Sequence, residues 1–423
     1  MKKGEVIIIG LLFGLSRIYV LAYPPYYPVE VNGRVEYRGY SDVKHDSERY
    51  ANMWYYGLMP YREHLFEYPP GAIPLMLIPL IVDQAGLGHY YPNYRVQIFI
   101  LETILFAGIV YTVYHLPIKR KQQRLALGFY ILAGALAKDF WYDGLDLVFI
   151  GSLTLAFIWR WSHNYNQGKH RVVFWAFFWL SVAVKMLTGP LLVPYFFLRR
   201  HQWRQEIMAL SLGAMVIWLI PLVLFRSSLS VFLFFHQYRP LKYEAFGTWI
   251  VLAVNDWTQT ETQTQIAPHF PMAGPATRVV EQSLLVVFPL SILMVLGWSL
   301  YQLRQQSGYE PQDRLTVLHY LIKYTLVYMF TIFLTSKIFS RPFHLWYVPL
   351  ITIYPFKQVK TQLIFMGWAL LLLALDTTPY LTVPPLMLGL VPLQRIRDVW
   401  RFIPLLMMLV MAIRLPRPAP SRG

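Results

Sequence analysis

The polar stretch 38–70 places Asp42, His45 and Asp46 close together in the sequence. A carboxylate held near a reacting hydroxyl group is able to take its proton and so act as a general base. Each acid also has a purely structural alternative. Asp46 followed by Ser47 is suited to capping the N-terminus of a helix, and Asp42 fits an ordinary acidic loop residue. The residue types alone leave both roles open for each acid.

A short amphipathic helix is expected directly after these acids. Apolar side chains recur there at helical spacing, and polar ones occupy the other side. The apolar set is Tyr50, Met53, Trp54 and Leu58, and the polar set is Glu48, Arg49 and Asn52. Gly57 is expected to end the helix, and Pro60-Tyr61 to turn the chain. Such a helix lies on a membrane surface, which would hold the acids at the level of the lipid head groups.

Four basic side chains at the ends of apolar segments are further candidates: Lys185, Lys337, Arg341 and His344. Basic groups at that level are suited to binding a phosphate group. The alternative is that long basic side chains only reach from the membrane into the interface. His344 is in addition a candidate for proton transfer. Both interpretations of the basic residues remain open at this point.

The overall composition places these residues in a membrane protein. Of 423 residues, 56% are hydrophobic and 14% are charged, against about 25% charged in an average soluble domain. Basic residues outnumber acidic ones by 38 to 22, and most of the excess falls in loops that the positive-inside rule assigns to the cytoplasm. We therefore expect membrane lipids as partners and no nucleic acid. With no cysteine, the chain has no disulfide, zinc–thiolate site or thiol nucleophile.

The apolar segments predict an all-α polytopic membrane protein with about 11–13 transmembrane helices. The clear candidates are 6–22, 96–115, 124–137, 145–161, 172–184, 187–198, 206–225, 282–303, 315–335, 343–356 and 361–375, followed by the shorter 384–394 and 402–413. The segment Gly71–Val82 is short and contains two prolines. We assign it to the interface, because this choice places the basic loops in the cytoplasm. Lys2 and Lys3 then put the N-terminus in the cytoplasm, and Arg17 favours a retained first helix over a cleaved signal peptide.

The same assignment predicts a single membrane domain over residues 1–423. Its parts are a first helix at 6–22, a first extracytoplasmic loop at 23–95, a helix bundle at 96–225, a second large extracytoplasmic loop at 226–281 and C-terminal helices at 282–423. A long polar loop between apolar helices is usually functional. The candidate chemistry is therefore expected on the extracytoplasmic side.

Three motifs follow one another along the chain. The first combines Tyr40-Ser41-Asp42-Val43, Gly57-x-x-Pro60-Tyr61 and Tyr68-Pro69-Pro70; the second is 176–200 around Lys185; the third is 336–350, with Lys337, Ser340 and Trp346. Together they resemble motifs of the polyprenol-phosphate-sugar-dependent glycosyltransferases of the GT-C superfold. The nearest families are glycosyltransferase family 87, which are polyprenol-phosphate-mannose-dependent α-mannosyltransferases, and the catalytic subunit of GPI mannosyltransferase I.

The resemblance implies a GT-C-like helix bundle in which an acid early in the first external loop, here Asp42, is the general base. Asp46 is a second catalytic candidate. The expected donor-phosphate residues are Lys185, Lys337, Arg341 and His344, and the expected contacts to sugar or acceptor are His45, Tyr61, Trp141, Asp143 and Trp346. Relatives of the GPI enzyme carry Asp-x-Asp, whereas Lys44 stands at the second position here. We therefore expect no metal and no other cofactor.

The function implied is transfer of a sugar, mannose by family expectation, from a polyprenyl-phosphate donor to a hydroxyl group of a lipid or glycan acceptor, with inversion. The expected location is the extracytoplasmic face of a bacterial plasma membrane. A transporter or flippase for lipid-linked saccharides is the alternative, since it also explains many helices and interfacial cations. It leaves the long, acid-bearing first loop unexplained. A single external cavity would favour the enzyme, and a pathway open to both membrane faces the transporter.

Overall fold

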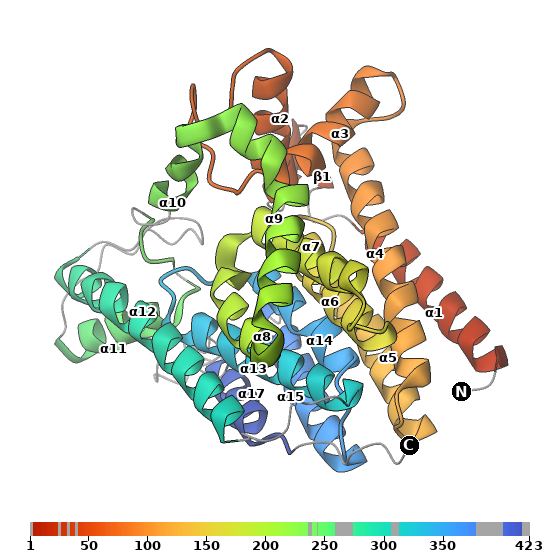
Figure 1. Ribbon diagram of the computed structural model, residues 1–423. Coiled ribbons are helices and arrows are strands. Elements are labelled where there is room, and N and C mark those ends of the chain that lie inside the picture. Colours follow the sequence, from red (N-terminus) through yellow and green to blue (C-terminus); the bar gives the residue numbers. More distant parts are fainter. Residues whose placement is uncertain are drawn as a thin grey trace.

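The computed structural model describes residues 3–23, 27–31, 34–38, 41–235, 239–242, 244–258, 274–305, 313–377 and 401–416. Helices dominate this part of the chain and pack into one bundle (Figure 1). The expected helix at 384–394 and the C-terminal residue Gly423 lie outside the described residues.

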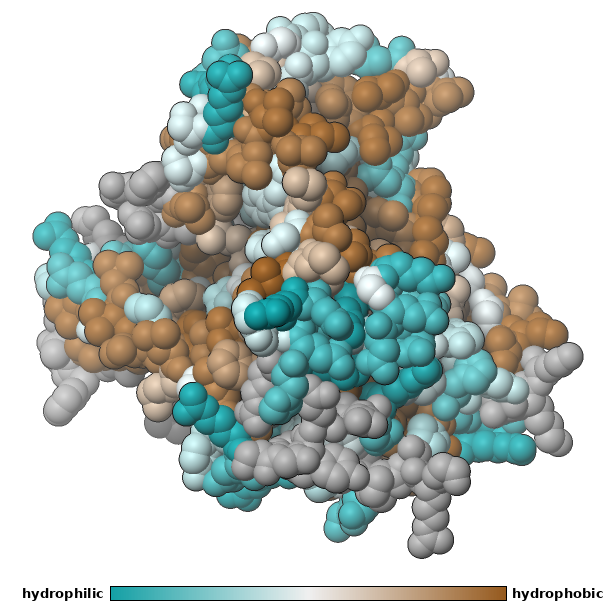
Figure 2. Space-filling view, in the orientation of Figure 1, coloured by the Kyte–Doolittle hydropathy of each residue, from teal (hydrophilic) through white to brown (hydrophobic). Residues whose placement is uncertain are grey.

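Within the described ranges, six helices are long and apolar enough to cross a membrane. They are α1 (Lys3–Ala22), α4 (Tyr90–His115), α9 (Trp203–Phe225), α12 (Pro275–Arg304), α13 (Arg314–Thr335) and α15 (Val359–Thr377). Helices α9 and α12 expose most of their apolar side chains, which form brown surfaces in Figure 2. Apolar faces of this extent need lipid around them, so the chain is an integral membrane protein. Helix α13, in contrast, is buried within the bundle.

Shorter elements fill the space between the long helices. Helices α5 (Arg120–Leu136), α6 (Asp146–Ser162) and α7 (Gly168–Val184) have 17 residues each, slightly fewer than the about 20 that a span requires. The other helices are α2 (Glu48–Tyr55), α3 (Ala72–Gln84), α8 (Leu192–Phe197), α10 (Val231–Phe235), α11 (Phe246–Thr258), α14 (Val348–Thr352) and α17 (Phe402–Arg414). The helical turns are η1 (Val43–Ser47), η2 (Met186–Leu191), η3 (Arg200–Gln202), η4 (Arg226–Ser230) and η5 (Arg341–Trp346).

Apart from 384–394, the expected helices coincide with these elements, but two of them are interrupted. The segment 187–198 divides into η2 and α8, and the segment 343–356 contains only the end of η5 and then α14. Pro349 at the start of α14 lacks an amide hydrogen, so it begins a helix more readily than it continues one. The predicted all-α membrane bundle is confirmed. The number of 11–13 spans and the domain boundaries stay predictions.

The first loop differs from the expectation at its beginning. Strands β1 (Tyr27–Val31) and β2 (Arg34–Arg38) form an antiparallel hairpin that the sequence did not predict. Helical structure then begins at Asp42 and continues through η1 into α2, and Ser47 makes no side-chain capping bond. The predicted cap at Asp46-Ser47 is therefore wrong, because the backbone is already helical before it. The expected end is confirmed: α2 stops at Tyr55, and Gly57 has a φ of 94°.

Helix α3 contains the short apolar segment that we assigned to the interface. Its 13 residues correspond to roughly 20 Å of helix, less than the roughly 30 Å of a bilayer core. Gly71 precedes it and donates a backbone hydrogen bond of 2.8 Å to the carbonyl oxygen of Ala183 at the end of α7. A Cβ atom on Gly71 would lie 2.7 Å from that oxygen. Glycine at this position therefore joins the first loop to the bundle.

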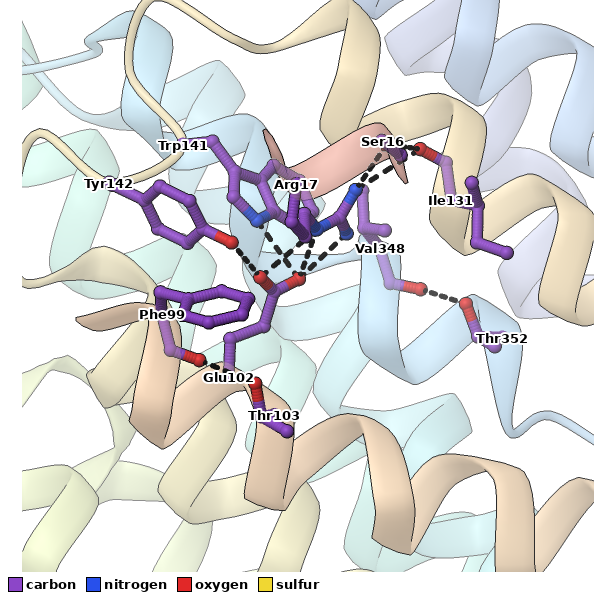
Figure 3. A network of polar contacts seen from close by, with 10 residues as sticks. All are labelled: Ser16, Arg17, Phe99, Glu102, Thr103, Ile131, Trp141, Tyr142, Val348 and Thr352. Carbon is purple, nitrogen blue, oxygen red and sulfur yellow. Dashed lines mark hydrogen bonds and ion pairs between the residues drawn. The ribbon is translucent and has the colours of Figure 1, made fainter. Parts of the chain in front are cut away.

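A buried ion pair connects α1 to α4 (Figure 3). The guanidinium of Arg17 donates to the Glu102 carboxylate at 2.7 and 2.9 Å, and both side chains are inaccessible to solvent. The indole of Trp141 donates to the same carboxylate at 3.0 Å, and the hydroxyl of Tyr142 also donates to it. A Cβ atom on Gly134 of α5 would clash with the Arg17 guanidinium. The pair therefore orders α1, α4, α5 and the segment that follows α5.

Replacing Glu102 by Gln is expected to destabilise the protein by about 3–5 kcal/mol, because it leaves the Arg17 guanidinium buried without a counter-charge. Thermal unfolding in detergent, followed by tryptophan fluorescence, measures this effect.

The matched control is Glu5→Gln, which removes the exposed pair of Glu5 with Arg124 at 2.6 Å. Exposed pairs of this kind contribute about 0–1 kcal/mol. Equal losses in the two variants would contradict a special role for the buried pair.

Candidate active site

A cavity of about 2000 Å³ lies where the first loop meets the ends of several helices. Its polar wall comes from the start of the helical part of the first loop, from the segment between α5 and α6, from Lys185 before η2, from Arg239, Lys242 and Glu244, and from the segment 336–341. Its apolar wall comes mainly from α12, between Leu284 and Leu296. The cavity therefore joins a cluster of charged groups to a long apolar surface.

Asp42 is a half-buried acid on the cavity wall, at the first helical residue of the loop. Its removal from water raises the pKa of its carboxyl above 3.8. The positive charges of Lys242 and Lys185 act in the opposite direction, and the negative charge of Asp146 adds to the rise. Asp42 therefore stands among both cations and other acids, in a place where a carboxylate is a better proton acceptor than in water.

Asp143 is a second, more deeply buried acid on the same wall. Burial raises its pKa to about 7, and the neighbouring charge of Asp42 adds to the rise. The hydroxyl of Ser41 donates to Asp143 Oδ1 at 2.7 Å and favours the charged form. Ser41 also accepts a bond of 3.1 Å from the backbone N–H of Lys44. One serine therefore connects the turn that carries Asp42 to the segment that carries Asp143.

Asp146, at the start of α6, holds Lys185 in place. Asp146 Oδ1 accepts hydrogen bonds from Lys185 Nζ and from Trp346 Nε1, each at 2.6 Å. The ammonium group of Lys185 also lies 5.5 Å from the ring centre of Phe343, which stacks on Trp346 at 4.1 Å. Lys185 therefore keeps a fixed position on the wall, with donor capacity left for an anion, because an ammonium group has three N–H donors.

The remaining cations of the wall come from two loops that are joined through their backbones. The N–H of Lys242 donates to the carbonyl oxygen of Lys337 at 3.0 Å. Arg341 lies 3.5 Å from the carboxylate of Glu244, and burial raises the pKa of that carboxyl. Desolvation lowers the pKa of Lys337. This cluster of Lys242, Lys337 and Arg341 is hereafter the cationic cluster.

The structure brings together six of the eleven residues singled out from the sequence. The six on the cavity wall are Asp42, Asp46, Asp143, Lys185, Lys337 and Arg341. Asp46 is half-buried and lies 3.3 Å from Arg49, so its carboxylate is already engaged on the loop surface.

The other five do not line the cavity. His45 is exposed, and the hydroxyl of Tyr61 donates to the backbone of Tyr68 at 2.7 Å. Trp141 belongs to the Glu102 network (Figure 3). His344 is fully buried and hydrogen-bonded to Asp376, and Trp346 holds Asp146 from behind. In this arrangement their contacts support the wall, and contact with a substrate stays a prediction.

Several charged residues of the wall are not among the site residues chosen from the sequence: Glu67, Asp146, Arg239, Lys242 and Glu244. Arg239 pairs with Glu67 of the first loop, far away in the sequence. Residues 239–244 have no periodicity or motif that would mark them. Their place depends on pairing with η5 and the first loop, which no local pattern indicates.

Within the described ranges, no group of three His, Asp or Glu side chains is arranged to hold a metal ion. A reaction without metal stays a prediction.

The comparisons with known proteins give a similarity to solved structures and none to a family model or curated protein. Among solved structures, the chain is similar to ArnT from Cupriavidus metallidurans, in a crystal structure bound to undecaprenyl phosphate. The identity is 15% and the TM-score 0.49, over 98% of this chain and 72% of that chain. A similarity of this size assigns neither a family nor a function to this chain.

The raised pKa of Asp143 predicts a pH-dependent stability. Folding raises this pKa from 3.8 to about 7, so the folded protein binds more protons than the unfolded chain between these values. The free energy of unfolding therefore falls as the pH rises through this range, by up to about 1.4 kcal/mol per pH unit for one group. Asp143→Asn is expected to remove this part of the slope, measured by thermal unfolding in detergent.

Ser41→Ala provides the matched control, because Ser41 favours the charged form of Asp143. Its loss is expected to raise the pKa of Asp143 further and to extend the falling slope to higher pH. An unchanged slope in Asp143→Asn would contradict the assignment.

Proposed function

We propose that the protein is a membrane glycosyltransferase with a GT-C-type fold, which transfers a sugar from a polyprenyl-phosphate donor to a hydroxyl group of an acceptor. The observation that carries the proposal is the cavity itself. It combines a half-buried acid, a group of cations and a long apolar wall within one space. A polyprenyl-phosphate sugar consists of an isoprenoid chain, a phosphate and a sugar. The apolar wall suits the isoprenoid chain, the cations suit the phosphate, and the acid lies where the sugar would react.

The apolar wall fits the isoprenoid chain of the donor. Leu284, Phe288, Ile292 and Leu296 line it along one side of α12. From Leu284 to Leu296 the helix rises by roughly 18 Å, at 1.5 Å per residue. A chain lying along this wall would exchange lipid contacts for protein contacts while its head group stayed at the polar end. The cationic cluster lies near this end, since Lys337 interacts with Glu281 of α12.

The reaction follows from the arrangement of charges. The Asp42 carboxylate takes the proton of the acceptor hydroxyl, and the hydroxyl oxygen attacks the anomeric carbon of the sugar. The bond between that carbon and the phosphate oxygen breaks, and its electron pair leaves with the phosphate. Lys337, Arg341 and Lys185 stabilise the negative charge on this leaving group. Attack from the face opposite the phosphate inverts the anomeric configuration.

Asp42 is proposed as the base because of its surroundings. Asp46 already faces Arg49 on the surface of the loop, so it is the second candidate. Asp143 accepts a hydrogen bond from Ser41. Its pKa of about 7 suits its carboxyl group to exchanging a proton with neighbouring groups near neutral pH. Mannose as the sugar rests on the resemblance of the sequence motifs to family 87 and the GPI enzyme.

The transporter remains the second candidate function. It would require a pathway between both membrane faces, lined by ionisable groups. The charged residues of the cavity instead lie at helix ends and in loops, which favours the enzyme.

Asp42→Asn is expected to lower sugar transfer by about 10²–10⁴-fold while binding of the donor is retained, because an amide cannot accept the proton. The measurement uses purified protein, radiolabelled polyprenyl-phosphate-mannose and a membrane lipid extract. If wild type is inactive, the donors polyprenyl-phosphate-glucose and -arabinose are tested next.

Asp46→Asn is the matched control, since it changes an acid on the same turn. A larger loss of transfer in Asp46→Asn than in Asp42→Asn would move the base to Asp46. Full activity of folded Asp42→Asn would show that Asp42 is not the base.

Replacing Lys337 and Arg341 by Met is expected to weaken binding of undecaprenyl phosphate by about tenfold for each residue, because each loses a charge-assisted bond to phosphate. Lys360→Met, an exposed lysine in α15 outside the cavity wall, is the control. Native mass spectrometry measures the bound lipid. Unchanged binding in the double variant would place the phosphate elsewhere.

A further inference from the structure

A group of basic side chains lies at the opposite end of α6 and α7 from the cavity. Asp146 at the start of α6 and Lys185 just after the end of α7 belong to the cavity wall. Arg160 is near the other end of α6, and Arg171 is in the first turn of α7. From Asp146 to Arg160 the helix rises by roughly 21 Å, at 1.5 Å per residue. The basic group is therefore separate from the candidate active site.

The ring of Tyr165, in the loop between α6 and α7, is at the centre of this group. The guanidinium carbons of Arg160, Arg171 and Arg199 lie 3.2, 5.7 and 5.9 Å from the centre of the ring. These side chains are 8%, 2% and 8% exposed. The Tyr165 hydroxyl donates to the carboxylate of Glu206 at 3.0 Å. The three arginines, hereafter the arginine group, therefore bring like charges together in a place largely removed from water, where they repel strongly.

Two members of the arginine group have polar partners. Arg171 donates to the backbone oxygen of Tyr165 at 2.9 Å, and its guanidinium lies 3.8 Å from the Glu206 carboxylate. Arg199 donates to the side chain of Asn166 at 3.4 Å. These contacts hold both guanidiniums in place beside the tyrosine.

Arg160 differs from the other two. No hydrogen bond or ion pair joins its guanidinium to a residue of the described ranges, and it lies on the face of the Tyr165 ring instead. Its nitrogens reach the surface, since none of them is sealed from solvent without a partner. Arg171 and Arg199 act on it with like charges and Glu206 with an opposite one. A nearly buried guanidinium without a hydrogen-bonding partner is costly, so an anion bound at Arg160 would stabilise this region.

The arginine group lies where the bundle meets the membrane surface. The loop that carries Tyr165 also carries the exposed Asn166. On α9, the buried Glu206 has Trp203 and Met208 close to it in the sequence, which are 50% and 58% exposed. An exposed tryptophan followed by exposed apolar side chains is typical of a helix that enters lipid at the level of the head groups. An anion at this level is therefore within reach of membrane lipids.

We propose that the arginine group is a binding site for a phosphate group, which the head group of an anionic membrane lipid supplies. Arg160 donates to the phosphate oxygens, because its planar guanidinium presents N–H groups in pairs that match them. Arg171 and Arg199 add positive charge. The acyl chains lie on α9, where Ile207 and Met208 are exposed, which favours a lipid over free phosphate. The site lies at the membrane face opposite the cavity and does not rest on the proposed function.

A lipid in this site would join three helices. The arginine group and Tyr165 connect the end of α6 to the start of α7, and Glu206 connects them to α9. Anything that binds only the folded state stabilises it. Anionic lipid is therefore expected to raise the midpoint of thermal unfolding.

The test measures lipid binding by native mass spectrometry and thermal unfolding in detergent, so neither readout needs enzymatic activity. The probes are dioleoylphosphatidylglycerol, dioleoylphosphatidylcholine and inorganic phosphate. Arg160→Met removes the charge and keeps an unbranched side chain. Arg314→Met is the matched control, because Arg314 is exposed at the same end of α6 and contacts the backbone oxygens of Trp161 and Ser162 at 3.5 and 3.4 Å.

The expected result separates the two arginines. Arg160→Met weakens binding of phosphatidylglycerol by about tenfold and loses the rise in the unfolding midpoint that this lipid gives to wild type. Arg314→Met keeps both. Phosphatidylcholine binds wild type more weakly, because its choline group balances the phosphate. Without lipid, Arg160→Met unfolds at or above the wild-type midpoint, since it no longer buries a charge that lacks a bonded partner.

Three outcomes would overturn the inference. Equal binding of phosphatidylglycerol to Arg160→Met and Arg314→Met would remove the site from the arginine group. Tighter binding of inorganic phosphate than of phosphatidylglycerol, lost in Arg160→Met, would make the ligand a free phosphate. A lower unfolding midpoint of Arg160→Met without lipid, together with unchanged lipid binding, would give Arg160 a purely structural role on Tyr165.

Discussion

The Glu102 carboxylate is the point on which the arrangement of the bundle depends. It lies in α4, away from water, and receives hydrogen bonds from Arg17 of α1 and from Trp141 and Tyr142 after α5. A buried charge is tolerated only where its partners are complete, so these three donors must return to the same place. This requirement fixes the segment that continues directly to Asp143 and Asp146. A structural ion pair thereby sets the position of two acids of the candidate site.

The wall of the cavity shows the same dependence on supporting groups. Asp146 joins Lys185 to Trp346, and Ser41 joins the turn of Asp42 to Asp143. Lys185 and Asp143 are thus each held by a partner that lies behind or beside them. Fixed charges of this kind need no reorganisation when charge develops in a reaction, which is the basis of electrostatic catalysis. The extended apolar wall is the feature on which our proposal of a lipid-linked substrate rests.

The first loop and η5 combine features that local sequence patterns determine with features that depend on distant residues. Hydropathy and spacing predicted the helices and the helix that ends before Gly57, because these patterns act over one or two turns. The early start of helix at Asp42 and the hairpin of β1 and β2 were missed. His344 was predicted to bind substrate from its place among basic residues, and Trp346 from its place in a motif. The structure gives them Asp376 and Asp146 as partners, and contact with substrate stays a prediction.

The sequence by itself determined the class of this protein, since its apolar segments and scarce charges require a membrane bundle. The resemblance of its motifs also singled out Asp42 as the candidate acid. Only the tertiary structure decided which cations surround that acid. Lys242 is held at the site by a backbone hydrogen bond to Lys337, which is far from it in the sequence. Contacts of this kind depend on the packing of the whole bundle, and no local pattern records them.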